Sequence, residues 1–122
     1  MGELSDYLAG LAEPDRAVLD AIRERALELV PDAVEGVSYG MGALRHRGRP
    51  LLSLRVAARH LALYPFSPEV VAAVAAEVGS AATSKGTIRF SAAEPLAPEV
   101  IDRVITLRRA EIDAAEDGRD GS

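Results

Sequence analysis

One stretch decides the fold class: residues 37–65, which run VSYGMGALRHRGRPLLSLRVAARHLALYP. In LLSLRVA and HLALY, apolar residues alternate with others, which is the period of a half-buried β-strand. The segments ALRHR and LLSLRVA flank RGRP, whose glycine and proline favour a turn, so the three together predict a hairpin. The stretch holds five arginines and both histidines but no carboxylate. It therefore predicts antiparallel strands with a basic face.

Outside this stretch the apolar pattern changes to that of helices. Residues 15–30 carry one apolar stripe, and residues 68–78 and 98–112 are apolar segments that each begin at a proline. The segment SKGTIRF, residues 84–90, predicts a turn followed by another strand. This order predicts an α+β fold, with an antiparallel sheet of four to five strands and with N-terminal, middle and C-terminal helices.

The length of 122 residues fits one domain. We expect this domain to span residues 1–115, and we expect the polar tail, residues 116–122, to be disordered. The chain lacks the basic and apolar regions of a signal peptide at its start, and it has no apolar run of about 18 residues. We therefore expect a cytoplasmic protein with no membrane partner.

Composition excludes several classes of function. The absence of cysteine rules out a disulfide framework, a thiolate metal site and a cysteine nucleophile. The net charge is -5, yet residues 36–68 carry a charge of +5. Acidic flanks repel phosphate, so nucleic acid is not an expected partner. The sequence has no nucleophile-elbow, zinc-protease or dinucleotide-binding motif, so we expect no catalytic residues and no enzyme.

Four segments occur in an order and at a spacing that resemble a known family. They are VSYGMGALRHRGRPLLSL, HLALYP, SKGTIRF and PLAPEVIDRVITLRRAE. Over residues 4–112 the chain resembles the YdhG-like family, small bacterial domains related in shape to frataxin. The best-known relatives are intracellular iron chaperones, while many have no assigned function. The resemblance thus implies delivery of Fe(II), as a weakly bound cargo, to the iron–sulfur cluster assembly machinery.

The chain departs from the family pattern at three positions. Gly42 and Leu44 stand where the family often has a proline and an aromatic residue, and Ala62 stands where it often has glycine. These departures bear on the details of any ligand pocket.

A row of carboxylates is the candidate metal site. Asp20, Glu24 and Glu28 are spaced by four residues on one predicted helix, and Asp32 continues the line. Oxygen ligands of this kind suit Fe(II) held weakly with water, and no tightly bound cofactor is expected. Arg16 could pair with Asp20, and the alternative is a solvated helix face.

The motif SYGM is the second candidate. Its residues are Ser38, Tyr39, Gly40 and Met41. Glycine permits a positive φ or the close approach of another group, and Tyr39 could stack on a ligand. The alternative is a bulged strand turn that the fold requires.

The motif SKGT is the third candidate. Ser84, Lys85, Gly86 and Thr87 combine hydroxyls, the single lysine and a free backbone, so they could cradle an anion. The alternative is a turn into an edge strand.

The two histidines are predicted to differ in role. His46 lies between two arginines, which predicts a surface side chain, whereas His60 and Tyr64 are expected on one strand face and His60 is the better functional candidate. Arg45, Arg47 and Arg55 are expected to share a face that could dock an acidic protein; the alternative is a solvated sheet edge protected by charge.

Two functions of different class follow. The first is a small iron-binding chaperone of the frataxin type. The alternative is a non-enzymatic module that binds a ligand or a protein, with a pocket beside the sheet lined by Tyr39, His60, Tyr64 and Lys85. Arg108, in the last motif, is a further family-motif position.

Overall fold

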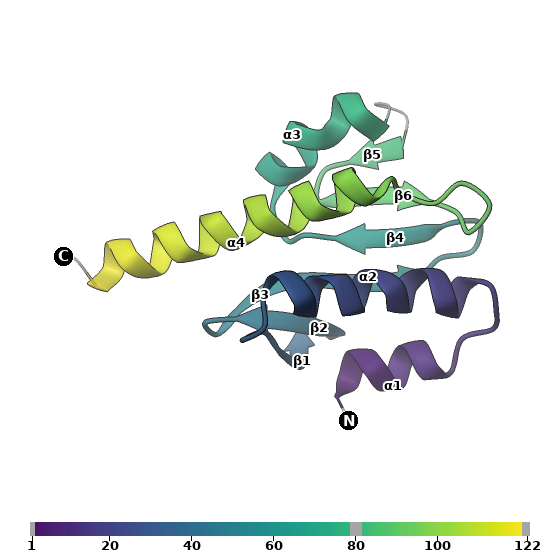
Figure 1. The fold of residues 1–122 in the computed structure, drawn as a ribbon, viewed down its shortest axis with the longest axis horizontal. Helices are drawn as coiled ribbons and strands as arrows, with labels where there is room; N and C mark the ends of the chain where they lie inside the picture. Colours follow the sequence, from purple (N-terminus) through teal and green to yellow (C-terminus); the bar gives the residue numbers. More distant parts are fainter. Residues whose placement is uncertain (1, 79–81, 121–122) are drawn as a thin grey trace.

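The computed structural model describes residues 2–78 and 82–120, and it has the predicted α+β architecture (Figure 1). The four helices are α1 (Glu3–Ala9), α2 (Asp15–Leu29), α3 (Pro68–Val78) and α4 (Pro98–Asp120). The strands are β1 (Val34–Ser38), β2 (Met41–His46), β3 (Arg49–Val56), β4 (Leu61–Tyr64), β5 (Thr83–Ser84) and β6 (Thr87–Phe90). None of the helices in the described residues is long and apolar enough to span a bilayer.

The strands form one antiparallel sheet in the order β1-β2-β3-β4-β6-β5. The sheet has six strands in the described residues, of which β5 has only two residues, instead of the four to five predicted. Tyr39 and Gly40 make the two-residue turn between β1 and β2, with φ values of 53° and 76°. Positive φ at both positions is typical of a type I′ turn, whose twist matches that of the strands it joins.

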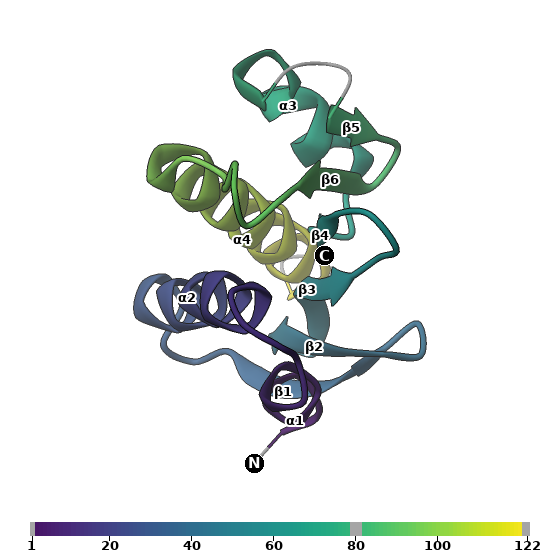
Figure 2. The ribbon, with the colours of Figure 1, turned by 90° about the vertical axis from the view of Figure 1, so that its right-hand side faces the viewer.

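The helices lie mainly on one side of the sheet (Figure 2). There α2 and α4 run side by side across the middle strands, α3 lies near β5 and β6, and α1 packs against β1 and β2. Gly42 is the contact point for α1, because a Cβ there would lie 2.8 Å from the backbone nitrogen of Leu4. The position that departs from the family pattern thus lets a helix approach the sheet closely.

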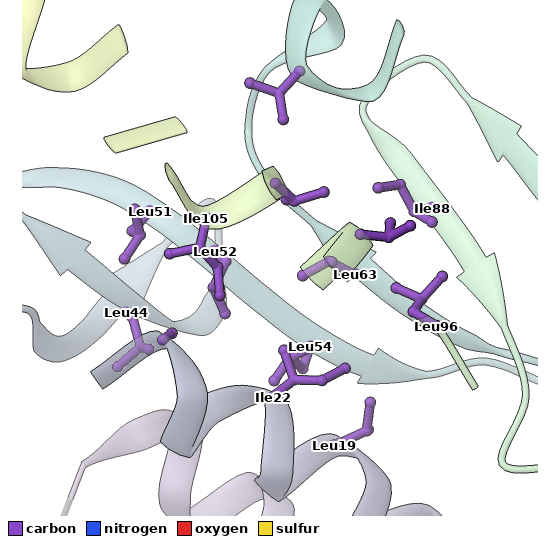
Figure 3. Packing of buried hydrophobic residues seen from close by; sticks show 14 of the residues in the cluster. Leu19, Ile22, Leu44, Leu51, Leu52, Leu54, Leu63, Ile88, Leu96 and Ile105 are labelled. Carbon is purple, nitrogen blue, oxygen red and sulfur yellow. The ribbon is translucent and has the colours of Figure 1, made fainter. Parts of the chain in front are cut away.

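The core fills the space between the sheet and the helices (Figure 3). Leu52 and Leu54 of β3 point toward Leu19 and Ile22 of α2 and Ile105 of α4, and each of the five is at most 2% exposed. The core is almost entirely aliphatic, as a chain with only 4% aromatic residues requires.

The C-terminal segment differs from the prediction. Residues 116–122 were expected to be disordered; α4 continues through Asp120, and residues 121–122 lie outside the described part of the chain. Glu116 Oε2 lies 2.5 Å from Arg49 Nε, so this part of the helix is tied to the start of β3. Polar composition alone predicts disorder and misses such a long-range contact.

Candidate functional site

The hollow around His60 combines an apolar floor with unpaired charged groups. It has a volume of about 570 Å³ and lies where the β3–β4 connection meets residues 91–97 and the end of α3. Its floor includes Phe90, Leu96 and Val100, each at most 9% exposed. We call this hollow the His60 pocket.

Local hydrogen bonds fix the two loops that form the pocket. The Ala57 amide donates to the His60 carbonyl oxygen at 2.8 Å, which closes the β3–β4 connection. On the other loop the Glu94 amide donates to Ser91 Oγ at 3.0 Å. Short closed turns of this kind hold the side chains of Arg59 and His60 at the rim.

The rim of the pocket carries polar and charged side chains that have no partner among the described residues. Neither Arg59 nor His60 has a side-chain hydrogen bond or ion pair with any residue that the structure describes. Glu94 also lines the pocket, and its carboxylate likewise lacks a partner in the described ranges. Arg59 and His60 also line a second hollow of about 320 Å³, so they stand between two spaces.

Such a pocket can bind a small anion with an apolar body. A guanidinium is suited to carboxylate or phosphate groups because its planar donors match them in pairs. Small-molecule sites combine apolar surface with placed polar groups, and both are present here, where Glu77, Arg89 and Glu94 also belong to the lining.

The carboxylate row on α2 does not form a metal site. Asp20 Oδ1 lies 2.7 Å from Arg23 Nε, and Glu28 Oε1 lies 3.4 Å from Arg25 Nη1. Asp32 lies in the turn that follows the helix. In residues 2–78 and 82–120, no group of three or more His, Cys, Asp or Glu side chains could hold a metal ion.

Two carboxylates of the row, Asp20 and Glu28, each contact an arginine three residues away, whereas Glu24 has no ion pair in the described residues. The hydrogen bond from Arg25 lowers the pKa of Asp102, and Arg25 also bridges to Glu28, so these charges are already balanced. The predicted pairing of Arg16 with Asp20 is wrong as well, because Arg16 Nε bonds Glu13 Oε2 at 2.8 Å.

The SYGM motif forms an exposed aromatic contact. Tyr39 is 84% exposed and stacks on Phe66 with ring centroids 5.6 Å apart. Ser38 and Met41 pair directly with each other across the turn, so no bulge is present there. Phe66 also has a positive φ, 57°, and sequence reasoning did not single it out.

The SKGT motif is a turn between β5 and β6. Lys85 and Gly86 occupy the turn between the paired residues Ser84 and Thr87. The Ser84 hydroxyl accepts a hydrogen bond from Arg89 Nη1 at 3.2 Å. The alternative interpretation, a turn into an edge strand, describes this geometry only in part, because the edge strand β5 precedes the turn and β6, which follows it, lies between β4 and β5.

The four residues expected to line one pocket are dispersed. His60 lines the His60 pocket, but Tyr39, Tyr64 and Lys85 do not. His60 lies in the connection that precedes β4, while Tyr64 ends β4, opposite Ser53 of β3.

His46 is buried, contrary to the surface position predicted for it. It is 6% exposed, and its Nε2 lies 2.8 Å from Asp113 Oδ1. The flanking arginines suggested solvent exposure, but the hairpin packs against acidic residues of α4. The pairing joins residues 67 positions apart, so no local sequence signal could have found it.

The three arginines expected on one free face are separated. A register shift between Leu44 and Arg45 and the position of Arg47 in a turn, with φ 53°, break the period of two. Arg47 Nη1 contacts Asp117 at 3.1 Å, and the Arg55 guanidinium lies 4.4 Å from the centre of the Tyr7 ring. The shared docking face is therefore not formed.

Arg108 has a structural role. Its Nε donates to the Pro50 carbonyl at 3.0 Å, and its Nη1 donates to Glu111 at 3.1 Å. Glu111 in turn accepts from Ser67 Oγ, which also accepts a hydrogen bond from the Val70 amide and thereby caps α3. This network joins α4, α3 and β3.

Comparison with known proteins identifies the fold. No family model matches the sequence, and no curated protein matches it. A crystal structure of a protein of the DUF1801 family, YdhG from Bacillus subtilis, superposes with a TM-score of 0.75. The identity is 20%, and the match covers 89% of this chain and 90% of that chain. The chain thus has the YdhG-like fold.

Proposed function

We propose that the chain is a non-enzymatic ligand-binding domain of the YdhG-like family, and that the His60 pocket binds a small organic anion with an apolar body. The family assignment is supported by the shared fold together with the four sequence motifs in their order. The observation that carries the function is the pairing of an apolar floor with the Arg59 guanidinium and the His60 ring, neither of which has a side-chain partner in the described residues, at one hollow.

The remaining features support binding over catalysis. In the part of the chain that the structure describes, no serine hydroxyl is hydrogen-bonded to a histidine, so an activated nucleophile of that kind is not in place. The iron-delivery interpretation has less support, since Asp20 and Glu28 of the α2 row are paired with arginines and no group of three or more ligating side chains is gathered in the described residues.

A titration with benzoate and phenyl phosphate tests the proposal. We expect saturable binding by calorimetry, with amide shifts in NMR spectra confined to residues 57–60, 77–82 and 89–100. Arg59→Gln should weaken benzoate binding about tenfold, because it removes a charge-assisted hydrogen bond. Glu94→Gln should tighten it, because it removes a repelling charge from the rim.

Lys85→Gln is the matched control. It removes an exposed cation that lies outside the pocket, so the affinity for benzoate should not change. Saturable binding that is insensitive to Arg59→Gln, or no binding of either anion, would refute the assignment.

A further inference from the structure

The titratable side chains that line the His60 pocket divide into two groups. Glu77 contacts Arg103, so its carboxylate already has a partner within the protein. Arg89 likewise donates a hydrogen bond to the Ser84 hydroxyl at 3.2 Å. The side chains of the others have no partner in the described residues, and these are Arg59, His60 and Glu94. The pocket thus offers donors for an anionic group and also one unpaired carboxylate.

Strand pairing brings these unpaired groups to one end of the sheet. Leu61 of β4 pairs with Phe90 of β6, so the chain before Leu61 and the chain after Phe90 leave adjacent strands at the same end. Adjacent strands lie about 4.8 Å apart, so the two loops begin as neighbours. One loop carries Arg59 and the other carries Glu94.

Arg59 and Glu94 do not pair with each other although both line one hollow. Two exposed opposite charges gain little from each other through water. A ligand that carries both complementary charges can bind each of them directly, in hydrogen bonds that charge strengthens. Its anionic group would meet the guanidinium, and its cationic group would meet the carboxylate.

The cationic group is organic and not a metal ion. Hard cations need several oxygen ligands, and Glu94 supplies the unpaired carboxylate of this lining alone. In residues 2–78 and 82–120, no group of three or more His, Cys, Asp or Glu side chains could hold a metal ion. An ammonium group needs only one carboxylate and water.

We propose that the ligand of the His60 pocket is an amino acid with an apolar side chain. Its carboxylate binds Arg59 and the His60 ring, its ammonium binds Glu94, and its side chain lies on the floor formed by Phe90 and Leu96. The volume of about 570 Å³ is of the size that small-molecule sites have. This inference rests on the proposed function, which supplies the carboxylate and the apolar body, and it adds the ammonium group.

Three ligands with the same phenyl body test this proposal by calorimetry. Phenylalanine carries both charges, hydrocinnamate lacks the ammonium, and phenethylamine lacks the carboxylate. We expect phenylalanine to bind at least about tenfold more tightly than either of the others, because each loses one charge-assisted hydrogen bond.

Glu94→Gln separates the two charges, because its effect should have opposite signs for two of the ligands. It should weaken phenylalanine binding about tenfold by removing the partner of the ammonium, and it should tighten hydrocinnamate binding by removing a repelling charge. Arg59→Gln should weaken the binding of both. Both side chains are exposed, so both variants should remain folded, which circular dichroism melting checks.

Glu24→Gln is the matched control, because it removes the same charge from an exposed position on α2 outside the pocket. It should leave all three affinities unchanged. If hydrocinnamate binding depends on Arg59 but phenylalanine binds no more tightly than hydrocinnamate or phenethylamine, or is not weakened by Glu94→Gln, this inference is overturned while the proposed function stands. If none of the three ligands binds, or if hydrocinnamate binding is insensitive to Arg59→Gln, both are overturned.

Discussion

His46 is the residue at which the basic hairpin and the acidic C-terminal helix meet. Its Nε2 bonds Asp113, while its Nδ1 is buried with no hydrogen-bond partner in the structure. In the neutral ring the proton therefore belongs on Nε2, which donates to the carboxylate. Arg47 donates to Asp113 at 3.2 Å and Arg109 forms an ion pair with it at 3.6 Å, so one carboxylate faces three basic side chains.

This arrangement predicts a pH-dependent contribution of Asp113 to stability. The hydrogen bond from His46, followed by that from Arg47, lowers the pKa of Asp113. A carboxyl group whose pKa is lowered by folding stabilises the fold when ionised. The contribution is complete above the unfolded pKa of about 3.9 and is lost as pH falls through the folded pKa. Asp113→Asn should cost roughly 1 kcal/mol at neutral pH.

Urea unfolding of the wild type and Asp113→Asn at neutral pH and at about pH 2 checks this expectation. The difference in unfolding free energy between the two proteins should shrink on acidification. Glu24→Gln is the control, since Glu24 is exposed and has no ion pair or hydrogen bond in the described residues. A difference that is the same at both pH values would contradict the assigned role of Asp113.

At the scale of elements, sequence patterns predicted the helices and hairpins that local interactions determine. The apolar period and the prolines predicted α2, α3 and α4, and the glycines in turns predicted the hairpins. The end of α4 was missed because Glu116 meets Arg49, which is 67 residues away. The candidate site shows the same limit. The sequence singled out His60 but not its chain neighbour Arg59, and Glu94 joins them only because two loops meet in the fold.

The packing of α1 on β2 gives a prediction for this element. A Cβ at Gly42 would lie 2.8 Å from backbone atoms of Glu3 and Leu4, which cannot rotate away as a side chain could. Gly42→Ala should therefore displace α1 and cost about 1–3 kcal/mol, as overpacking typically does. Urea unfolding measures the loss, and hydrogen exchange of the amides in α1 should become faster.

Gly10→Ala is the matched control for this change. Gly10 has a negative φ of -85°, and a Cβ there would be 3.6 Å from the nearest atom, an ordinary contact. It should leave both measurements nearly unchanged. Equal effects of the two substitutions would show that the close approach at Gly42 is unimportant.

In the whole molecule, the uneven distribution of charge along the sequence is largely balanced by ion pairs within the fold. Residues 36–68 carry only positive charge, which suggested an external acidic partner. In the structure, Arg47 and Arg49 instead contact Asp113, Glu116 and Asp117 of α4. The acidic C-terminal part of α4 thus acts as the partner of the basic β2–β3 hairpin.

A charge exchange between Arg49 and Glu116 tests this conclusion. Arg49→Glu and Glu116→Arg should each destabilise the protein by about 1 kcal/mol or more, because each places like charges side by side. The double variant should recover most of that loss, since the pair is restored with opposite polarity. Urea unfolding at low and high salt measures both effects, which should diminish as salt screens the partly exposed pair.

Hydrogen exchange over residues 113–118 distinguishes a tie to the hairpin from a helix end that is stable by itself. Each single variant should increase exchange there, and the double variant should reverse the increase. If exchange is equally fast in all four proteins, the helix end is not held by the hairpin, and the polar segment behaves as its composition alone predicts. If exchange is equally slow, α4 is stable to its end without the hairpin. Only faster exchange in both single variants, reversed in the double variant, supports α4 as the internal partner of the basic strands.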